Sequence, residues 1–155
     1  MLEEKLKELK LIRIAEQLGV WLQEAARHEW SYNDFLLKLC DEELSSKQEK
    51  RCDLNIKQAK FPYIKTLESF DFSYQASINQ NQVQELSKCR WVSNGENLIL
   101  LGPPGVGKTH LAVASGIEAI KQGYRTLFVS TQGLLASLAK AHSENKLEER
   151  LRILC

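Results

Sequence analysis

The chain has 155 residues, a formal net charge of +1, 43% hydrophobic and 26% charged residues, so it is not a polycation, and its charge favours no class of partner. No apolar run approaches the ~20 residues that a membrane span requires, and the N-terminus does not resemble a signal sequence. We therefore expect a cytoplasmic protein with no membrane partner. The four cysteines form no C-x-x-C pair and have no histidine at a zinc-ligand spacing, which argues against disulfide and zinc frameworks.

Residues 1–60 are predicted to form a helical N-terminal module. Apolar residues spaced by three and four between Leu11 and Ala25 form the seam of an amphipathic helix, which Gly19 could divide into two. A second helix is expected to begin at Ser31, whose side chain can cap it, with Asp34 at the reciprocal position of a capping box.

The second helix becomes polar on every side beyond Leu44. Lys47, Lys50 and Arg51 share a face there and would suit DNA phosphates or an acidic partner. A run of charges is also what a solvated helix face looks like, so both interpretations stay open.

Residues 61–97 are predicted to be a linker and the entry to a second domain. A proline at position 62 ends the helical module, because it forces the preceding residue out of the α region. The aromatic-rich stretch 61–72 has no clear period and is expected to lie extended over the next domain. A short helix near 81–88 should follow.

Residues 98–155 contain the most specific signal in the chain. The segment 102–109 reads Gly102-Pro103-Pro104-Gly105-Val106-Gly107-Lys108-Thr109, a complete G-x-x-x-x-G-K-[ST] phosphate-binding loop. Glycines let the backbone wrap its N–H groups around a phosphate, and the following helix adds its positive N-terminal end.

Each of the last residues of this loop has an expected role. Lys108 should contact the β- and γ-phosphates of ATP and assist catalysis, and the Thr109 hydroxyl should complete the coordination of Mg²⁺. His110 follows on the first helical turn and is expected to lie near the nucleotide. A simple Gly/Pro turn would leave Lys108 and Thr109 unexplained.

The surroundings of the loop match what it requires. An apolar strand is predicted at 98–101, and a helix should follow the loop and end at Gly123. A second buried strand is predicted at 125–130, and helices at 134–141 and 147–154.

With these residues in view, the chain resembles the IstB-like ATPases, AAA+ proteins that assist transposition of bacterial insertion sequences, and more distantly the DnaC-type helicase loaders. The resemblance runs essentially end to end, and it is carried by the segments 32–36, 61–72, 101–112 and 123–129. It implies an α/β fold in which the helical module precedes the first half of a P-loop AAA+ (ASCE-type) three-layer α/β/α domain.

The resemblance also implies partners. The family's helical module contacts the transposase or neighbouring subunits, and its ATPase domain forms homo-oligomers on double-stranded DNA that present target DNA to the transposase. The family is arginine-rich where this chain has Lys47, Gln48, Glu49 and Lys50 before Arg51, which weakens the case for DNA contact there.

A hydrolytic AAA+ site needs a further strand ending in Asp-Glu, and no such run follows residues 125–130. We therefore expect an N-terminal fragment, truncated after its second core strand, that binds ATP without hydrolysing it. A DnaC-like helicase loader, a non-catalytic interaction module and a functionless remnant remain as alternatives.

Overall fold

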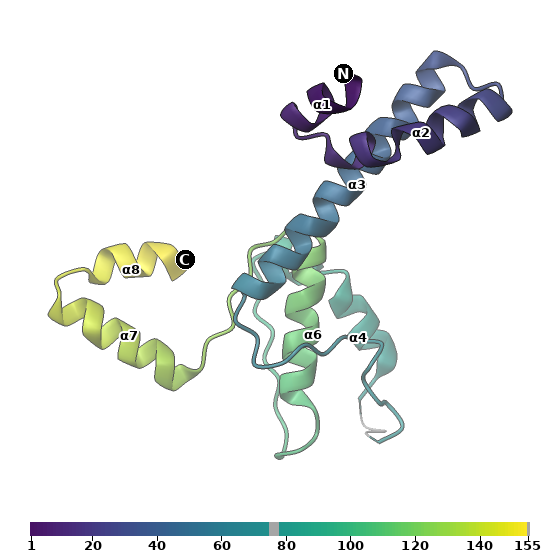
Figure 1. Cartoon of the computed structure of the whole chain (residues 1–155). Helices are drawn as coiled ribbons and strands as arrows, with labels where there is room; N and C mark the ends of the chain where they lie inside the picture. The colour runs from purple at the N-terminus through teal and green to yellow at the C-terminus, as the bar shows by residue number, and fades with distance from the viewer. Residues whose placement is uncertain (75–77, 155) are drawn as a thin grey trace. The chain divides into compact units, whose positions relative to one another are not determined.

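The computed structural model describes residues 1–74 and 78–154; residues 75–77 of the predicted linker and residue 155 lie outside this description. Its helices are shown in Figure 1. In chain order they are α1 (Leu2–Glu8), α2 (Ile12–Arg27), α3 (Tyr32–Gln58), α4 (Gln80–Ser87), α5 (Arg90–Ser93), α6 (Lys108–Lys121), α7 (Thr131–Ser143) and α8 (Leu147–Leu154). None of the described helices is long and apolar enough to cross a membrane.

The chain divides into two compact units, Met1–Leu54 and Asn55–Cys155. The boundary falls inside α3, a few residues before the end of the predicted 1–60 module. The limits predicted for the three segments of the chain stay a prediction.

The first unit has a small helical core. α1 packs against α2, and α2 packs against the first half of α3. The buried side chains of this core are Ile14, Leu18, Trp21 and Leu39, with Leu6, Leu11 and Phe35 partly buried around them.

The capping prediction at Ser31 is confirmed. Its hydroxyl oxygen accepts a hydrogen bond from the backbone N–H of Asp34 at 3.2 Å, and the same hydroxyl donates to the Asp34 carboxylate at 2.6 Å. The prediction that Gly19 divides the preceding helix is wrong, because α2 runs unbroken from Ile12 to Arg27. Packing of the helix face on α3 outweighs the low helix propensity of one glycine.

The second unit is organised around α6. Its buried face includes Val113, Ala114, Ile117 and Ile120, and α4 packs against it. The side chain of Gln122, just after α6, donates a hydrogen bond to the Ser87 carbonyl at the end of α4. Gly123 has φ +90°, which confirms it as the residue that ends this helix.

The linker after α3 lies along α6, as predicted for an extended segment laid over the second domain. Phe61 packs on Phe128 with ring centroids 6.3 Å apart, and a Cβ on Gly116 in the middle of α6 would lie 2.9 Å from the Phe61 ring. The Phe128 N–H donates to the carbonyl of fully buried Ala59 at 2.7 Å.

The predicted strands 98–101 and 125–130 are wrong for this structure. The described residues contain no β-strand, and both segments are extended coil (Figure 1). Their pattern is nevertheless that of strands: Ile99 and Leu101 are 75% and 88% exposed, whereas the residues between and before them are half-buried. A strand requires a hydrogen-bonded neighbouring strand, and neither segment is paired in a β-ladder within the described residues. The structure therefore does not confirm the predicted α/β three-layer domain.

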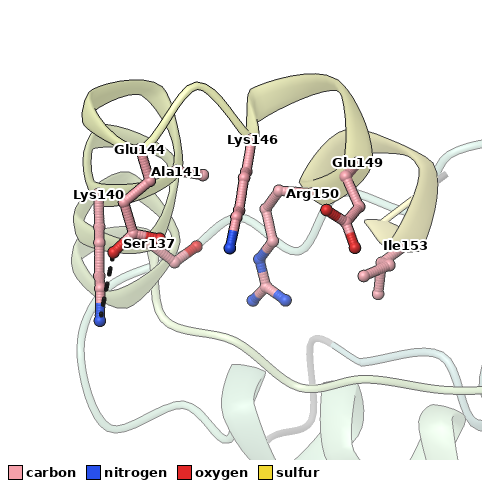
Figure 2. A pocket seen from close by; sticks show the side chains of 8 residues that line it. All are labelled: Ser137, Lys140, Ala141, Glu144, Lys146, Glu149, Arg150 and Ile153. Carbon is pink, nitrogen blue, oxygen red and sulfur yellow. Dashed lines mark ion pairs between the residues drawn. The ribbon is translucent and has the colours of Figure 1, made fainter.

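The predicted helices at 134–141 and 147–154 are confirmed as α7 and α8. The two helices pack on each other and enclose a shallow groove of about 330 Å³. Figure 2 shows Lys146 and Arg150 pointing the same way into this groove, while Lys140 of α7 pairs with Glu144, the residue that follows this helix.

Candidate functional site

The phosphate-binding loop connects the extended segment 98–101 to α6. Gly105 and Gly107 have φ values of +85° and +89°, a left-handed backbone conformation that a residue with a side chain would adopt only with strain. Gly107 is also the N-cap of α6, and no side chain caps the helix there. The first N–H groups of α6 are therefore available to a ligand with acceptor oxygens.

The Lys108 ammonium lies at the mouth of this loop. It donates hydrogen bonds to the carbonyls of Gly102 at 2.9 Å and Pro103 at 2.7 Å. These bonds hold a positive charge next to the uncapped helix end. Phosphate oxygens are stronger acceptors than backbone carbonyls and can take over the same ammonium group.

Thr109 is exposed at the first turn of α6. In the part of the chain that the structure describes, no three His, Cys, Asp or Glu side chains lie close enough to hold a metal ion. A Mg²⁺ at Thr109 would need phosphate oxygens among its ligands, and the predicted role of the hydroxyl stays a prediction.

A cavity of about 410 Å³ adjoins the loop. One wall comes from α4, with Val83 and Leu86, and the other from the exposed apolar residues of the segment 99–103. Lys108 reaches its edge.

The structure places the predicted ligands of the nucleotide together, because they are consecutive in one loop and the start of one helix. Their roles in nucleotide binding stay predictions for all nine residues: Gly102, Pro103, Pro104, Gly105, Val106, Gly107, Lys108, Thr109 and His110.

The His110 side chain has partners that the sequence did not reveal. Its Nε2 lies 2.8 Å from the Thr66 carbonyl oxygen and 3.2 Å from the Ser69 hydroxyl, and its ring packs edge-on against Phe70. The imidazole therefore faces the linker, while the His110 backbone N–H remains part of the first turn of α6.

The linker residues beside His110 form a turn with its own hydrogen bonds. The Thr66 side chain bonds to the Glu68 carboxylate, and this bond is the main reason why the pKa of Glu68 is lowered. Further along, the pKa of Asp71 is lowered because its carboxylate accepts bonds from the hydroxyl and the N–H of Ser73. The sequence contained two signals for the contact between the linker and the start of α6: the aromatic-rich segment 61–72, and a glycine, Gly107, beside which an aromatic ring can lie.

The three basic residues predicted for DNA or partner contact lie on α3 and differ in whether they form an ion pair. Lys47 is 3.5 Å from the carboxylate of Glu43, a residue that is only 5% exposed. Glu43 in turn accepts a hydrogen bond from the Ile14 N–H at the start of α2. Lys50 and Arg51 are exposed and form no ion pair with any residue in the described ranges.

Comparison with known proteins agrees with the loop. The sequence model of the family described as IstB-like ATP binding protein matches residues 4–155. Three relatives are named as ATP-binding proteins of insertion sequences: IS21 of Pseudomonas aeruginosa, IS5376 of Geobacillus stearothermophilus and IS232 of Bacillus thuringiensis. They are 42%, 40% and 37% identical to this chain over 97%, 94% and 95% of its length.

The matched regions make up 57%, 58% and 59% of those three relatives, so the chain spans less than two thirds of their length. The family match nevertheless covers nearly all of the chain and includes both the helical unit and the phosphate-binding loop. The chain therefore belongs to the IstB-like ATP-binding protein family.

Proposed function

We propose that this chain binds MgATP through residues 102–110 and serves as an ATP-dependent helper of insertion-sequence transposition. The observation that carries the proposal is the loop itself: an uncapped helix N-terminus beneath two left-handed glycines, with the Lys108 ammonium held at its mouth. Relatives named as ATP-binding proteins of insertion sequences support the choice of nucleotide and of biological setting.

Each residue contributes a separate part of the binding chemistry. The backbone N–H groups from 105 to 110 surround a phosphate, Lys108 exchanges its two carbonyl partners for phosphate oxygens, and the Thr109 hydroxyl supplies one oxygen to a Mg²⁺ ion that the phosphates also bind. The bound metal neutralises phosphate charge.

Calorimetric titration of the chain with MgADP and MgATP tests this assignment. Lys108→Ala should abolish measurable binding, and Thr109→Ser should retain more affinity than Thr109→Ala. Lys121→Ala is the matched control, because Lys121 ends the same helix and pairs on the surface with Glu118. Equal nucleotide affinity for the unmodified chain and Lys108→Ala would contradict the assignment.

For DNA, we propose contact through Lys50 and Arg51 rather than through Lys47, whose ammonium is paired with Glu43. Binding to duplex DNA should be weak, because a few phosphate contacts release few counterions, and it should weaken further as salt is added, because these contacts are electrostatic. Lys50→Ala combined with Arg51→Ala should flatten the salt dependence of the affinity, and Lys57→Ala on the same helix is the comparison variant. Sequence-specific binding insensitive to salt would contradict this proposal.

The remaining partners follow from the family. We propose that the protein forms homo-oligomers on DNA and delivers target DNA to a transposase. Co-purification of the chain with the transposase encoded by the same insertion sequence would support this role, and co-purification with a replicative helicase instead would favour a helicase loader.

A further inference from the structure

The linker residues 66–72, here called the 66–72 turn, are fastened to the phosphate-binding loop at two points. The first is the His110 imidazole. Its Nε2 lies within hydrogen-bond distance of the Thr66 carbonyl and of the Ser69 hydroxyl, whose own proton is donated to the same carbonyl at 2.9 Å. Because a carbonyl oxygen can only accept, the neutral imidazole carries its proton on Nε2.

The second point is Phe70, which is 8% exposed. Its ring centroid lies 5.0 Å from that of His110 and 4.9 Å from that of Phe72. A Cβ built on Gly107 would come within 2.6 Å of the Phe70 ring. The ring therefore rests directly on the backbone of the residue that ends the loop and caps α6.

These two contacts make the conformation of the loop depend on the turn. Gly107 and His110 are three residues apart on either side of Lys108 and Thr109, so the turn touches both ends of the segment that contains these two predicted ligands. If the 66–72 turn leaves, Gly107 loses the ring that covers it, and His110 on the first turn of α6 loses its hydrogen-bonding partners in the linker.

We propose that His110 is a positioning residue that fastens the 66–72 turn to the phosphate-binding loop, so that docking of the turn and nucleotide binding favour each other. This inference rests on the proposed nucleotide site. The imidazole acts through the turn, whereas the His110 backbone N–H belongs to the site itself. Coupling between two such events is reciprocal, so the turn must raise nucleotide affinity by the same factor by which nucleotide stabilises the docked turn.

The first arm of the test measures the MgADP affinity of the full chain by calorimetry. His110→Leu, which keeps the bulk but removes the donor, should weaken binding about 5- to 20-fold, within the usual range of coupling between sites. His110→Gln, whose amide can donate to the Thr66 carbonyl from a similar position, should restore most of the affinity. Phe70→Leu should weaken binding in the same direction.

The matched control is Phe61→Leu. Phe61 belongs to the same linker and also covers a glycine of α6, but that glycine is Gly116, far from the loop along the helix. This variant should lower thermal stability without changing MgADP affinity. Circular dichroism of every variant separates loss of binding from loss of folding.

The second arm measures the reciprocal effect by limited trypsin digestion. Lys65 is exposed and directly precedes the turn, so cleavage after Lys65 reports on undocking. Saturating MgADP should slow this cleavage in the unmodified chain and in His110→Gln, but not in His110→Leu. Cleavage sites within residues 1–54 provide the internal reference.

The outcomes separate the two proposals. If the unmodified chain binds MgADP and Lys108→Ala does not, yet folded His110→Leu binds as tightly as the unmodified chain and is equally protected at Lys65, the positioning role is wrong and the nucleotide site stands. If the unmodified chain does not bind MgADP, both proposals are wrong. Loss of affinity in His110→Leu with recovery in His110→Gln supports the role of the hydrogen bond.

Discussion

The unit Met1–Leu54 and the unit Asn55–Cys155 differ in how they bury their apolar residues. In the first, one helix face supplies Ile14, Leu18 and Trp21 to a common core. In the second, α6 is well buried, but Ile99 and Leu101 of an extended segment remain exposed. A helix satisfies its own backbone and needs only a neighbour for one face, whereas a strand needs a partner for its hydrogen bonds as well.

The largest expected effect concerns the helical unit. Trp21→Ala should destabilise it by about 3–5 kcal/mol, because it removes a large buried side chain from a small core. A peptide of residues 1–60 should be helical by circular dichroism, and this substitution should unfold it. Leu22→Ala, at the neighbouring and 50% exposed position, is the control and should change little. A coil spectrum for the unmodified peptide would show that the helices depend on the rest of the chain.

Glu43 provides the next test of how the first unit is held together. Glu43→Ala should cost about 1–3 kcal/mol, since the Ile14 N–H loses its acceptor at a buried helix start. Glu42→Ala removes only ion pairs with Lys38 and Arg13 and should cost clearly less, because solvent screens exposed ion pairs. Thermal unfolding of the two variants measures the difference in their stability. Equal losses of stability would mean that the buried hydrogen bond to Ile14 contributes no more than the exposed ion pairs.

The exposed segment of the second unit should tolerate change. Leu101→Ser should alter the free energy of unfolding by no more than about 0.5 kcal/mol, because the side chain is 88% exposed. Ile117→Ser, at a position 2% exposed on α6, is the contrasting variant and should be strongly destabilising. A large cost for Leu101→Ser in chemical denaturation would mean that the segment 98–101 is covered in solution.

The smallest effect is a pH dependence within the 66–72 turn. The Thr66 hydroxyl lowers the pKa of Glu68, so the contribution of this carboxylate to the turn is present above the ordinary glutamate value of about 4.3 and is lost as the pH falls through the lowered value. A carboxyl NMR titration should place the Glu68 midpoint below about 4.3, and Thr66→Val should move it upward. A midpoint unaffected by Thr66→Val would assign the shift to another cause.

Local features of this protein were predictable because their causes lie within a few residues. The Ser31 cap, the end of α6 at Gly123 and the phosphate loop each depend on consecutive residues, and each was located from the sequence alone. The core face of α2 was only partly identified, since Ala15 and Leu18 are buried but Leu22 is half exposed and Trp21 takes its place. Which of two adjacent apolar stripes is buried depends on the partner helix.

Contacts between distant segments were not predictable in the same way. The strands 98–101 and 125–130 were expected from β-forming residues, yet strand formation depends on neighbours that the described chain does not supply. Thr66, the hydrogen-bonding partner of His110, lies 44 residues earlier, and nothing in the sequence between them predicts this bond. The expectation that His110 lies near the nucleotide stays a prediction, and the sequence did not indicate that its side chain contacts Thr66 and Ser69.

Hydrogen–deuterium exchange with and without saturating MgADP tests the central claim most directly, because it reports on both units in one experiment. We expect nucleotide to slow exchange of the amides at 105–110 and, through His110, of the 66–72 turn, while residues 1–54 exchange as before. The same experiment on Lys108→Ala should show no protection. Unchanged exchange at 105–110 in the unmodified chain, or equal protection in Lys108→Ala, would contradict the assignment of this loop as the nucleotide site.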